Sequence, residues 1–168
     1  MKMIKSFIAA AALMAAASSA FATTTVVNLT QSASNPLDYT GGFNLVHNGS
    51  FTDTFTFTPV FSSSLVSAVL TSIGFTSVTD INFTSVKLNG VSLNIVNGVV
   101  DSASTLTQLN ISGPLSLVVS GTSGLNASYS GNINVTAVVP EPETYALMLG
   151  GLGLVGFAAR RRKAAKQA

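Results

Sequence analysis

Residues 51–58 read Phe-Thr-Asp-Thr-Phe-Thr-Phe-Thr, which is the most regular alternation in the 168-residue chain. Successive side chains of a β-strand point to opposite faces, so this stretch would have one aromatic face and one threonine face. The aromatic face comprises Phe51, Asp53, Phe55 and Phe57. Burial of each phenylalanine ring contributes about 2–3 kcal/mol to stability. The stretch therefore predicts a strand whose phenylalanines lie in the core.

Short strand-like runs separated by turn residues continue on both sides of this stretch. Asn89-Gly90 lies between two apolar runs and is typical of a two-residue type I′ turn, in which both residues have positive φ. Asn97-Gly98 predicts a second tight turn of the same kind. About eight to ten short strands with regular turns predict an all-β domain, an antiparallel β-sandwich or jelly-roll-like fold, over residues 23–138. We refer to residues 23–138 as the body.

Two segments of the body make more specific predictions. Residues 62–75 fit helical spacing, but they also fit a strand with Leu65, Val69 and Ile73 on one face, and the neighbouring strands favour the second interpretation. The last strand, within residues 127–138, would turn Ile133, Val135 and Ala137 toward the core.

The charge of the chain is unevenly distributed. The whole chain has a net charge of +2, but the body contains one basic residue, Lys87, and four aspartates, so its own charge is about 1 − 4 = −3. The aspartates are Asp38, Asp53, Asp80 and Asp101. An acidic body does not favour a nucleic-acid partner. The chain has no cysteine, so neither a disulfide nor a zinc–thiolate site is expected.

The candidates for chemistry in the body are few. His47 lies near Ser50 and Asp53, and these residue types could form a hydrolase triad. No nucleophile-elbow or protease signature accompanies them, so a solvated turn histidine is the favoured interpretation and no enzyme is predicted.

Asp53 is unusual because it shares the aromatic face, where an unpaired carboxylate is costly. It could cap a backbone, lie at the rim of the sheet, or bind Ca²⁺ together with Asp38, Asp80 or Asp101. No Asp-x-Asp loop with calcium-binding spacing occurs, so we predict a structural role, with neither a metal site nor a cofactor.

The threonine face of the same strand has two interpretations. Thr52, Thr54, Thr56 and Thr58 could form a flat hydroxylated surface that binds ice or polysaccharide. The alternative is that threonine fills exposed strand positions without a ligand, as it does in many sheets.

The N-terminal residues 1–22 predict a secretory signal peptide. Lys2 and Lys5 precede an apolar run, and Ala20-Phe21-Ala22 is an A-x-A cleavage signature. We expect signal peptidase to cut after Ala22. An uncleaved anchor helix is the less favoured alternative, because the apolar run is short.

The C-terminal tail, residues 139–168, has three parts in a fixed order. A proline-rich acidic motif (residues 139–143) precedes fifteen uncharged residues (145–159) and a basic stretch (160–166). The middle part predicts a short transmembrane helix about 22 Å long, against about 30 Å of hydrocarbon, which suits a temporary anchor. Four glycines within it lower its hydropathy. A C-terminal core helix is the less favoured alternative, because it does not explain the basic stretch.

Val-Pro-Glu-Pro, a glycine-rich apolar helix and Arg-Arg-Arg together resemble the PEP-CTERM sorting signal of Gram-negative bacteria. The resemblance implies recognition and cleavage by an exosortase, a membrane enzyme, in proteins that accompany exopolysaccharide production. Pro140, Glu141 and Pro142 would be the recognition motif, and Arg160, Arg161 and Arg162 the cytoplasmic stop.

Phe51, Asp53 and Phe55 also resemble the signature of the FxDxF family of PEP-CTERM proteins. That family implies no established biochemical activity. We therefore expect an exported, non-enzymatic surface or extracellular-matrix protein of the biofilm. The expected partners are signal peptidase, exosortase, the inner membrane as a transient anchor, and exopolysaccharide.

Overall fold

The computed structural model describes residues 21–138 and 142–165, and the side chains of residues 22–138 and 145–157. The chain separates into two compact units between Val138 and Val139. We call residues 21–138 the strand unit. The predicted signal helix lies outside the described residues, apart from Phe21 and Ala22, which belong to the first strand.

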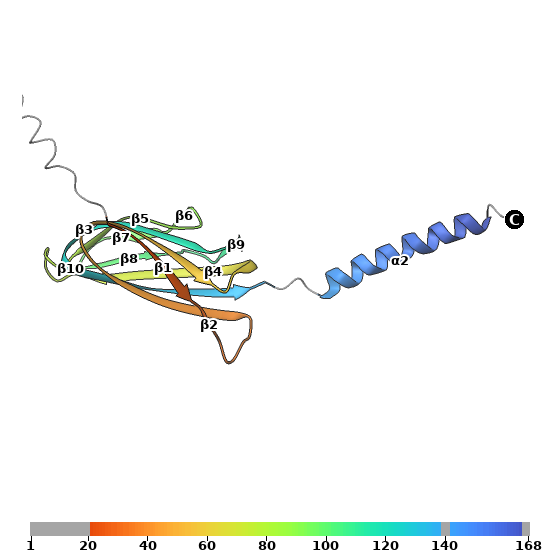
Figure 1. Ribbon diagram of the computed structural model, residues 1–168, viewed down its shortest axis with the longest axis horizontal. Coiled ribbons are helices and arrows are strands. Elements are labelled where there is room, and N and C mark those ends of the chain that lie inside the picture. The colour runs from red at the N-terminus through yellow and green to blue at the C-terminus, as the bar shows by residue number, and fades with distance from the viewer. Residues whose placement is uncertain (1–20, 139–141, 166–168) are drawn as a thin grey trace, which may run out of the picture. The chain divides into compact units, whose positions relative to one another are not determined.

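The strand unit is all-β, as predicted from the sequence (Figure 1). Its strands are β1 (Phe21–Asn28), β2 (Thr30–Gln31), β3 (Asp38–Thr58), β4 (Phe61–Ile73), β5 (Ile81–Leu88), β6 (Val91–Ser92), β7 (Asn94–Val96), β8 (Val100–Ser104), β9 (Leu109–Gly113) and β10 (Ser116–Ala137).

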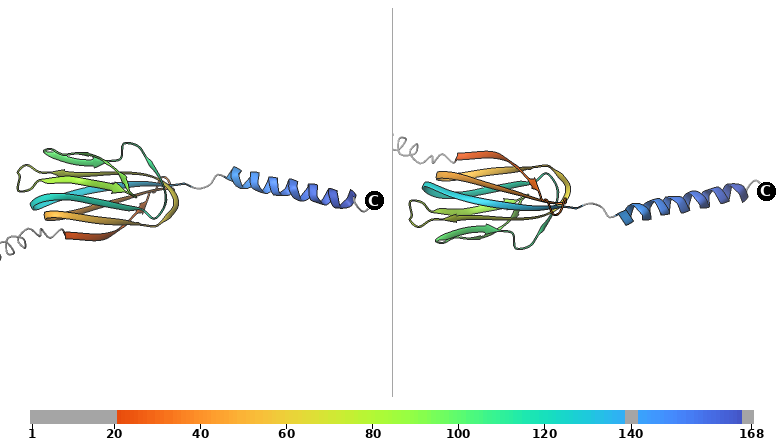
Figure 2. Two further views of the ribbon diagram at one scale, coloured as in Figure 1. Left: turned by 90° about the horizontal axis from the view of Figure 1, so that it is seen from above. Right: turned by 90° about the horizontal axis from the view of Figure 1, so that it is seen from below.

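All ten strands are connected by hydrogen bonds into one sheet, with the main order β1-β3-β10-β4-β8-β7. The short strands extend it: β2 pairs with β3, β5 with β10, β6 with β5, and β9 with β4. The two longest strands, β3 and β10, pair with each other along almost their whole length and lie side by side in the middle of the strand unit (Figure 2).

The sheet folds over on itself because β3 and β10 both bend. Phe43 and Phe55 lie 55 − 43 = 12 residues apart on β3, about 40 Å in a straight strand, yet their ring centroids are 4.1 Å apart. The bend of β3 lies at Gly49, which has a φ of 90°. The pairing register of β10 shifts at the matching position, between Ser123 and Ala127. The core is thus enclosed by one continuous sheet, and the predicted sandwich or jelly-roll arrangement is not confirmed.

The prediction of a purely antiparallel sheet is wrong for β1. This strand pairs in parallel with the second half of β3, from Phe21 opposite Phe51 to Asn28 opposite Thr58. Parallel neighbours require a long connection. Residues 29–50, which include β2 and the first half of β3, provide that connection.

The aromatic face of residues 51–58 is in the core, as predicted. Phe51, Phe55 and Phe57 are 2, 0 and 2 % exposed. The prediction for the last strand also holds for Ile133 and Val135, which are buried, while Ala137 is half-buried.

The favoured strand interpretation of residues 62–75 is confirmed up to Ile73 in β4, but the face that contains Leu65, Val69 and Ile73 is not the buried one. Val69 and Ile73 are 45 and 57 % exposed, and Val66, Ala68 and Leu70 are buried instead. Both faces of β4 have apolar residues, so alternation alone cannot choose between them. Pairing with β10 decides, because it places Ala68 and Val66 opposite the buried Ile133 and Val135.

The two Asn-Gly sequences behave differently. Asn89 and Gly90 have φ values of 46° and 84° and join β5 to β6, which confirms the predicted tight turn. Asn97-Gly98 does not form a two-residue turn, because the innermost pair of β7 and β8 joins Val96 to Ser102 and leaves residues 97–101 between them. The Asn97 side chain instead binds the backbone of Phe83, donating through Nδ2 to its carbonyl (3.1 Å) and accepting from its amide (3.2 Å).

The second unit contains one described helix, α2 (Pro142–Ala165), longer than the predicted 145–159. Pro142 is its first residue, a position where the missing amide hydrogen of proline costs nothing. Within residues 21–138 and 142–165, no helix is long and apolar enough to cross a membrane. The predicted transmembrane helix is therefore not confirmed. The physical reason lies in its sequence, since four glycines interrupt a short apolar run that ends at arginines.

Candidate functional site

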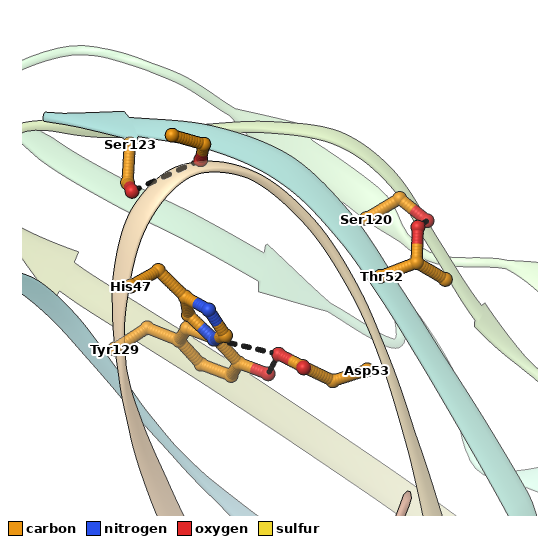
Figure 3. Close-up of polar contacts among 7 residues, drawn as sticks. His47, Thr52, Asp53, Ser120, Ser123 and Tyr129 are labelled. Carbon is orange, nitrogen blue, oxygen red and sulfur yellow. Dashed lines mark hydrogen bonds and ion pairs between the residues drawn. The ribbon is translucent and has the colours of Figure 1, made fainter. Parts of the chain in front are cut away.

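The three residues of the F-x-D-x-F sequence all face the core, and Asp53 is the centre of a buried polar cluster. We call His47, Asp53 and Tyr129 the buried cluster (Figure 3). The Tyr129 hydroxyl donates to Asp53 Oδ2 at 2.6 Å. His47 Nε2 lies 2.8 Å from the same oxygen, an ion-pair distance without the alignment of a hydrogen bond.

The bend of β3 brings this cluster together. His47 precedes Gly49 and Asp53 follows it, so the two side chains lie on opposite limbs of the bent strand and converge (Figure 3). Tyr129 comes from β10, where it pairs with Leu45. His47 is 7 % exposed and Asp53 is fully buried.

Aromatic rings surround the buried cluster. Phe51 stacks on His47, with centroids 4.0 Å apart and an interplanar angle of 11°. Phe55 and Phe83 meet Tyr129 edge to face, at 6.4 and 5.6 Å. Aromatic pairs in such geometries contribute about 0.5–1.5 kcal/mol beyond their buried area. The F-x-D-x-F sequence therefore supplies two rings and one acceptor to the same part of the core.

The pKa of Tyr129 is raised far above its ordinary value of 10.0, mainly by burial and further by the hydrogen bond and charge of Asp53. The neutral phenol is thus favoured in the folded state. Its stabilisation is complete below the pKa of unfolded tyrosine and is lost as the pH rises above about 10.

We predict that Tyr129→Phe flattens the alkaline loss of stability. Each pH unit above about 10 should lower the wild-type free energy of unfolding by about 1.4 kcal/mol through this group, and the variant lacks the ionisable phenol. At neutral pH the variant should be less stable by about 1–3 kcal/mol, because Asp53 loses its donor. Urea unfolding at neutral pH and at pH of about 11 measures both effects. Equal alkaline slopes for the two proteins would contradict the assignment.

The structure does not assemble a Ser-His-Asp triad. Ser50 pairs with Thr122 on the face of the sheet opposite Asp53 and is half-buried, whereas His47 and Asp53 lie in the core. The prediction of a solvated His47 is also wrong, because this ring is buried against Phe51. Sequence reasoning missed Tyr129, which lies 76 residues from Asp53 and has no local signal that links the two.

The four aspartates of the body do not form one group. Asp38 accepts from Asn35 Nδ2 (2.8 Å) and from Thr136 Oγ1 (2.7 Å). Asp53 is occupied by His47 and Tyr129, so the suggested calcium site between Asp53 and another aspartate is not formed. In the part of the chain that the structure describes, no three His, Cys, Asp or Glu side chains group as a metal site.

The threonine face lies on the outside of the folded sheet. Thr52, Thr54 and Thr56 are half-buried and Thr58 is exposed. Hydroxyl-bearing neighbours on β1 and β10 widen this face: Thr24 pairs with Thr54, Ser116 with Thr56 and Ser120 with Thr52. Two contacts organise it, Thr52 with Ser120 (3.1 Å) and Thr58 Oγ1 to Asn28 Oδ1 (2.8 Å). The result is a hydroxyl-rich surface across three strands, interrupted by Val26 opposite Thr56 and Val118 opposite Thr54.

The predicted sorting residues belong to the second unit. Pro140 and Glu141 lie outside the described residues, as does the predicted cleavage residue Ala20, whereas Pro142 begins α2. The backbone of Arg160, Arg161 and Arg162 is helical, and their side chains are not among those described. Among the described side chains, the core residues of the strand unit lie between Val27 and Val135.

Comparison with known proteins yields one informative result. Residues 138–163 match the family model of the PEP-CTERM protein-sorting motif. This model describes a sorting signal and not an enzyme. A search of curated proteins found no significant match.

Two solved structures were also compared. One is a β-glucosidase from Paenibacillus barengoltzii (14 % identity, TM-score 0.25), with 70 % of this chain and 11 % of the glucosidase covered. The other is a GH26-CBM35 β-(1,4)-mannanase from Podospora anserina (12 %, TM-score 0.24), with 64 % of this chain and 21 % of the mannanase covered. The chain thus spans a small part of either enzyme, and TM-scores this low do not indicate a shared fold.

Two observations on the tail agree. The order of proline-rich motif, apolar run and basic stretch resembles a sorting signal, and the family model matches the same residues. The chain carries a PEP-CTERM protein-sorting motif in residues 138–163, which implies an exported protein that is sorted by an exosortase.

Proposed function

We propose that this chain is a non-enzymatic protein of the cell surface or extracellular matrix, released to its site through its C-terminal tail. The observation that carries the proposal is the match of residues 138–163 to the sorting-motif model. Association with exopolysaccharide and biofilm is part of the proposal. The row of threonine and serine hydroxyl groups on the outer face of β1, β3 and β10 supports it, because hydroxyl groups can hydrogen-bond a hydrated polysaccharide.

The tail acts as a sorting signal that is removed by cleavage. Exosortase recognises the motif formed by Pro140, Glu141 and Pro142. The helix that starts at Pro142 holds the protein at the inner membrane until the protein is cleaved. Arg160–Arg162 remain on the cytoplasmic side. The boundary between the two compact units, after Val138, lets the tail be removed without loss of any core residue.

Export begins with the signal peptide, which is cut after Ala22. Cleavage there removes Phe21 and Ala22 from β1. Residues 23–28 keep their pairing with residues 53–58 of β3, so the sheet retains most of this strand. The finished product is the body, residues 23–138.

The body belongs to the FxDxF type of PEP-CTERM protein. Support comes from the positions of Phe51, Asp53 and Phe55, which together surround Tyr129 and His47. In this proposal the sequence F-x-D-x-F specifies the packing of the core and binds no ligand.

Replacing Pro140, Glu141 and Pro142 together with alanine tests the sorting function. The variant should accumulate in the native host as a full-length, cell-associated protein, because exosortase no longer recognises it. The wild type should be shorter and released. Immunoblots of cell and medium fractions measure both size and location. Thr144→Ala, just outside the motif, is the matched control and should behave as the wild type. A triple variant that is shortened and released as before would refute the proposal.

The polar outer face supports a second candidate function, a carbohydrate- or ice-binding module. The supporting observation is the row of hydroxyl groups across β1, β3 and β10. In this case Thr54→Lys with Thr56→Lys should abolish polysaccharide pull-down or ice-recrystallisation inhibition, because two ammonium groups disrupt a flat neutral surface. Thr40→Lys, away from this row, should leave binding unchanged. Binding that survives the double substitution counts against this function.

A further inference from the structure

Asp80 and Asp101 come together where two loops meet beside β5 and β8. The Gly74 amide donates to the Val99 carbonyl at 3.2 Å, which joins the loop before β5 to the loop before β8. Asp80 packs directly on Gly74, since a Cβ at residue 74 would lie 2.6 Å from Asp80 Oδ1. On the neighbouring strand, Asp101 pairs with Ser72, two residues before Gly74.

Each of the two carboxylates has one oxygen held by an amide and one oxygen without a partner outside the pair. Asp101 Oδ1 accepts from the Gly98 amide at 2.9 Å, and Asp80 Oδ2 accepts from Asn82 Nδ2 at 2.8 Å. The remaining oxygens, Asp80 Oδ1 and Asp101 Oδ2, are buried and have no hydrogen-bond donor outside the pair. Asp101 as a whole is fully buried. Two buried carboxylate oxygens that face only each other are costly, so the pair requires either a shared proton or a cation between them.

No basic side chain neutralises this pair. Among the side chains that the structure describes, Lys87 is the single lysine or arginine, and it is exposed on β5 opposite Val118. His47, the single histidine of the chain, contacts Asp53 and not this pair. Burial raises the pKa of Asp101 and the Gly98 amide lowers it, while the charge of Asp80 and a side-chain hydrogen bond with Asp80 raise it further. The two carboxylates are thus close enough to repel each other.

We propose that Asp80 Oδ1 and Asp101 Oδ2 bind a calcium ion. Two carboxylate oxygens without donors are hard ligands, and calcium accepts oxygen ligands in a flexible geometry. No third acidic or histidine side chain joins them within the described residues, so backbone carbonyls and water complete the coordination. A site with two carboxylates is weak, comparable to the calcium sites of extracellular modules, with Kd of about 10⁻⁴–10⁻³ M. The ion would pin the loops before β5 and β8 to each other.

The test is the calcium dependence of thermal stability of the full chain, purified and freed of metal with EDTA. Addition of CaCl₂ to about 10 mM should raise the Tm of the wild type by about 5 °C or more. MgCl₂ should have a smaller effect, because magnesium demands a stricter geometry. Titration calorimetry with CaCl₂ should show binding of one ion.

Variants of the pair make the test specific. Asp101→Asn and Asp80→Asn should each abolish the calcium-dependent rise in Tm. Without metal, each should be at least as stable as the wild type, because the repulsion between two carboxylates is removed. Asp38→Asn is the matched control, since Asp38 already has two donors, and it should keep the full rise. If calcium does not change the Tm of the wild type, the proposal is overturned, and the two carboxylates share a proton instead. A rise that persists in both pair variants would overturn it equally.

Discussion

Asp53→Ala is expected to lower the free energy of unfolding of the strand unit by about 3–5 kcal/mol. Asp53 is fully buried and is the acceptor for the Tyr129 hydroxyl and the partner of His47. The substitution leaves both groups in the core without a partner, and it also leaves a cavity between aromatic rings. Urea unfolding followed by circular dichroism measures the change, with the m-value as a check that the same transition is observed.

Asp38→Ala is the matched control for Asp53→Ala. Asp38 also accepts two side-chain hydrogen bonds, but it is half-buried, so water can replace the lost acceptor. The control should lose about 1 kcal/mol. Similar losses for the two variants would mean that the buried cluster has no special role in the core.

Phe55→Ala is expected to destabilise the protein by about 3–5 kcal/mol, the usual cost of removing a large buried ring. Phe55 is fully buried, packs against Phe43 at 4.1 Å and meets Tyr129 edge to face. It therefore joins the two halves of the folded sheet and the buried cluster. The chain has no cysteine, so no disulfide can compensate for the loss.

Thr54→Ala, the next residue on the same strand, separates burial from strand propensity. Its side chain lies on the outer face and is half-buried, so the expected loss is within about 0.5 kcal/mol. Thermal unfolding of the two variants under identical conditions gives the comparison. A loss at Thr54 as large as that at Phe55 would show that the inner and outer faces have been assigned incorrectly.

These expectations place the F-x-D-x-F sequence in a structural role. Phe51 stacks on His47, Asp53 accepts from Tyr129, and Phe55 closes the contact with the other half of β3. The three positions act on groups from both sides of the bend at Gly49 and from β10. A short local sequence can thus fix a long-range arrangement, because every second residue of one strand faces the same core.

Features that depend on adjacent residues were predictable from the sequence. Alternation over residues 51–58 indicated the buried face of β3, and Asn89-Gly90 indicated a turn with two positive φ angles. Asp53 stood out because a carboxylate shared a face with three phenylalanines. These signals are local, and the physical constraints that produce them act within a few residues.

Features that depend on distant pairing were not predictable. The inward face of β4 is chosen by its register with β10, since both faces have apolar residues. Asn97-Gly98 fails as a tight turn because Asn97 is held by the backbone of Phe83, 14 residues away. Asp53 pairs with Val119 on β10, so its contact with Tyr129 of the same strand forms only because the sheet folds over. No sequence period carries this information.

For the tail, the sequence is more informative than the structure. Its identity follows from the order of residues in 138–163, and the family model matches the same range. The structure adds the extent of α2 and the boundary after Val138 between the strand unit and the unit that carries the sorting motif.

The C-terminal mass of the released protein tests the central claim most directly. The protein should be isolated from the medium of its native host, digested, and analysed by mass spectrometry for its last peptide. We predict an end near the Pro140-Glu141-Pro142 motif, without Arg160–Arg162. Recovery of the released protein with its residues 160–168 intact would contradict the account.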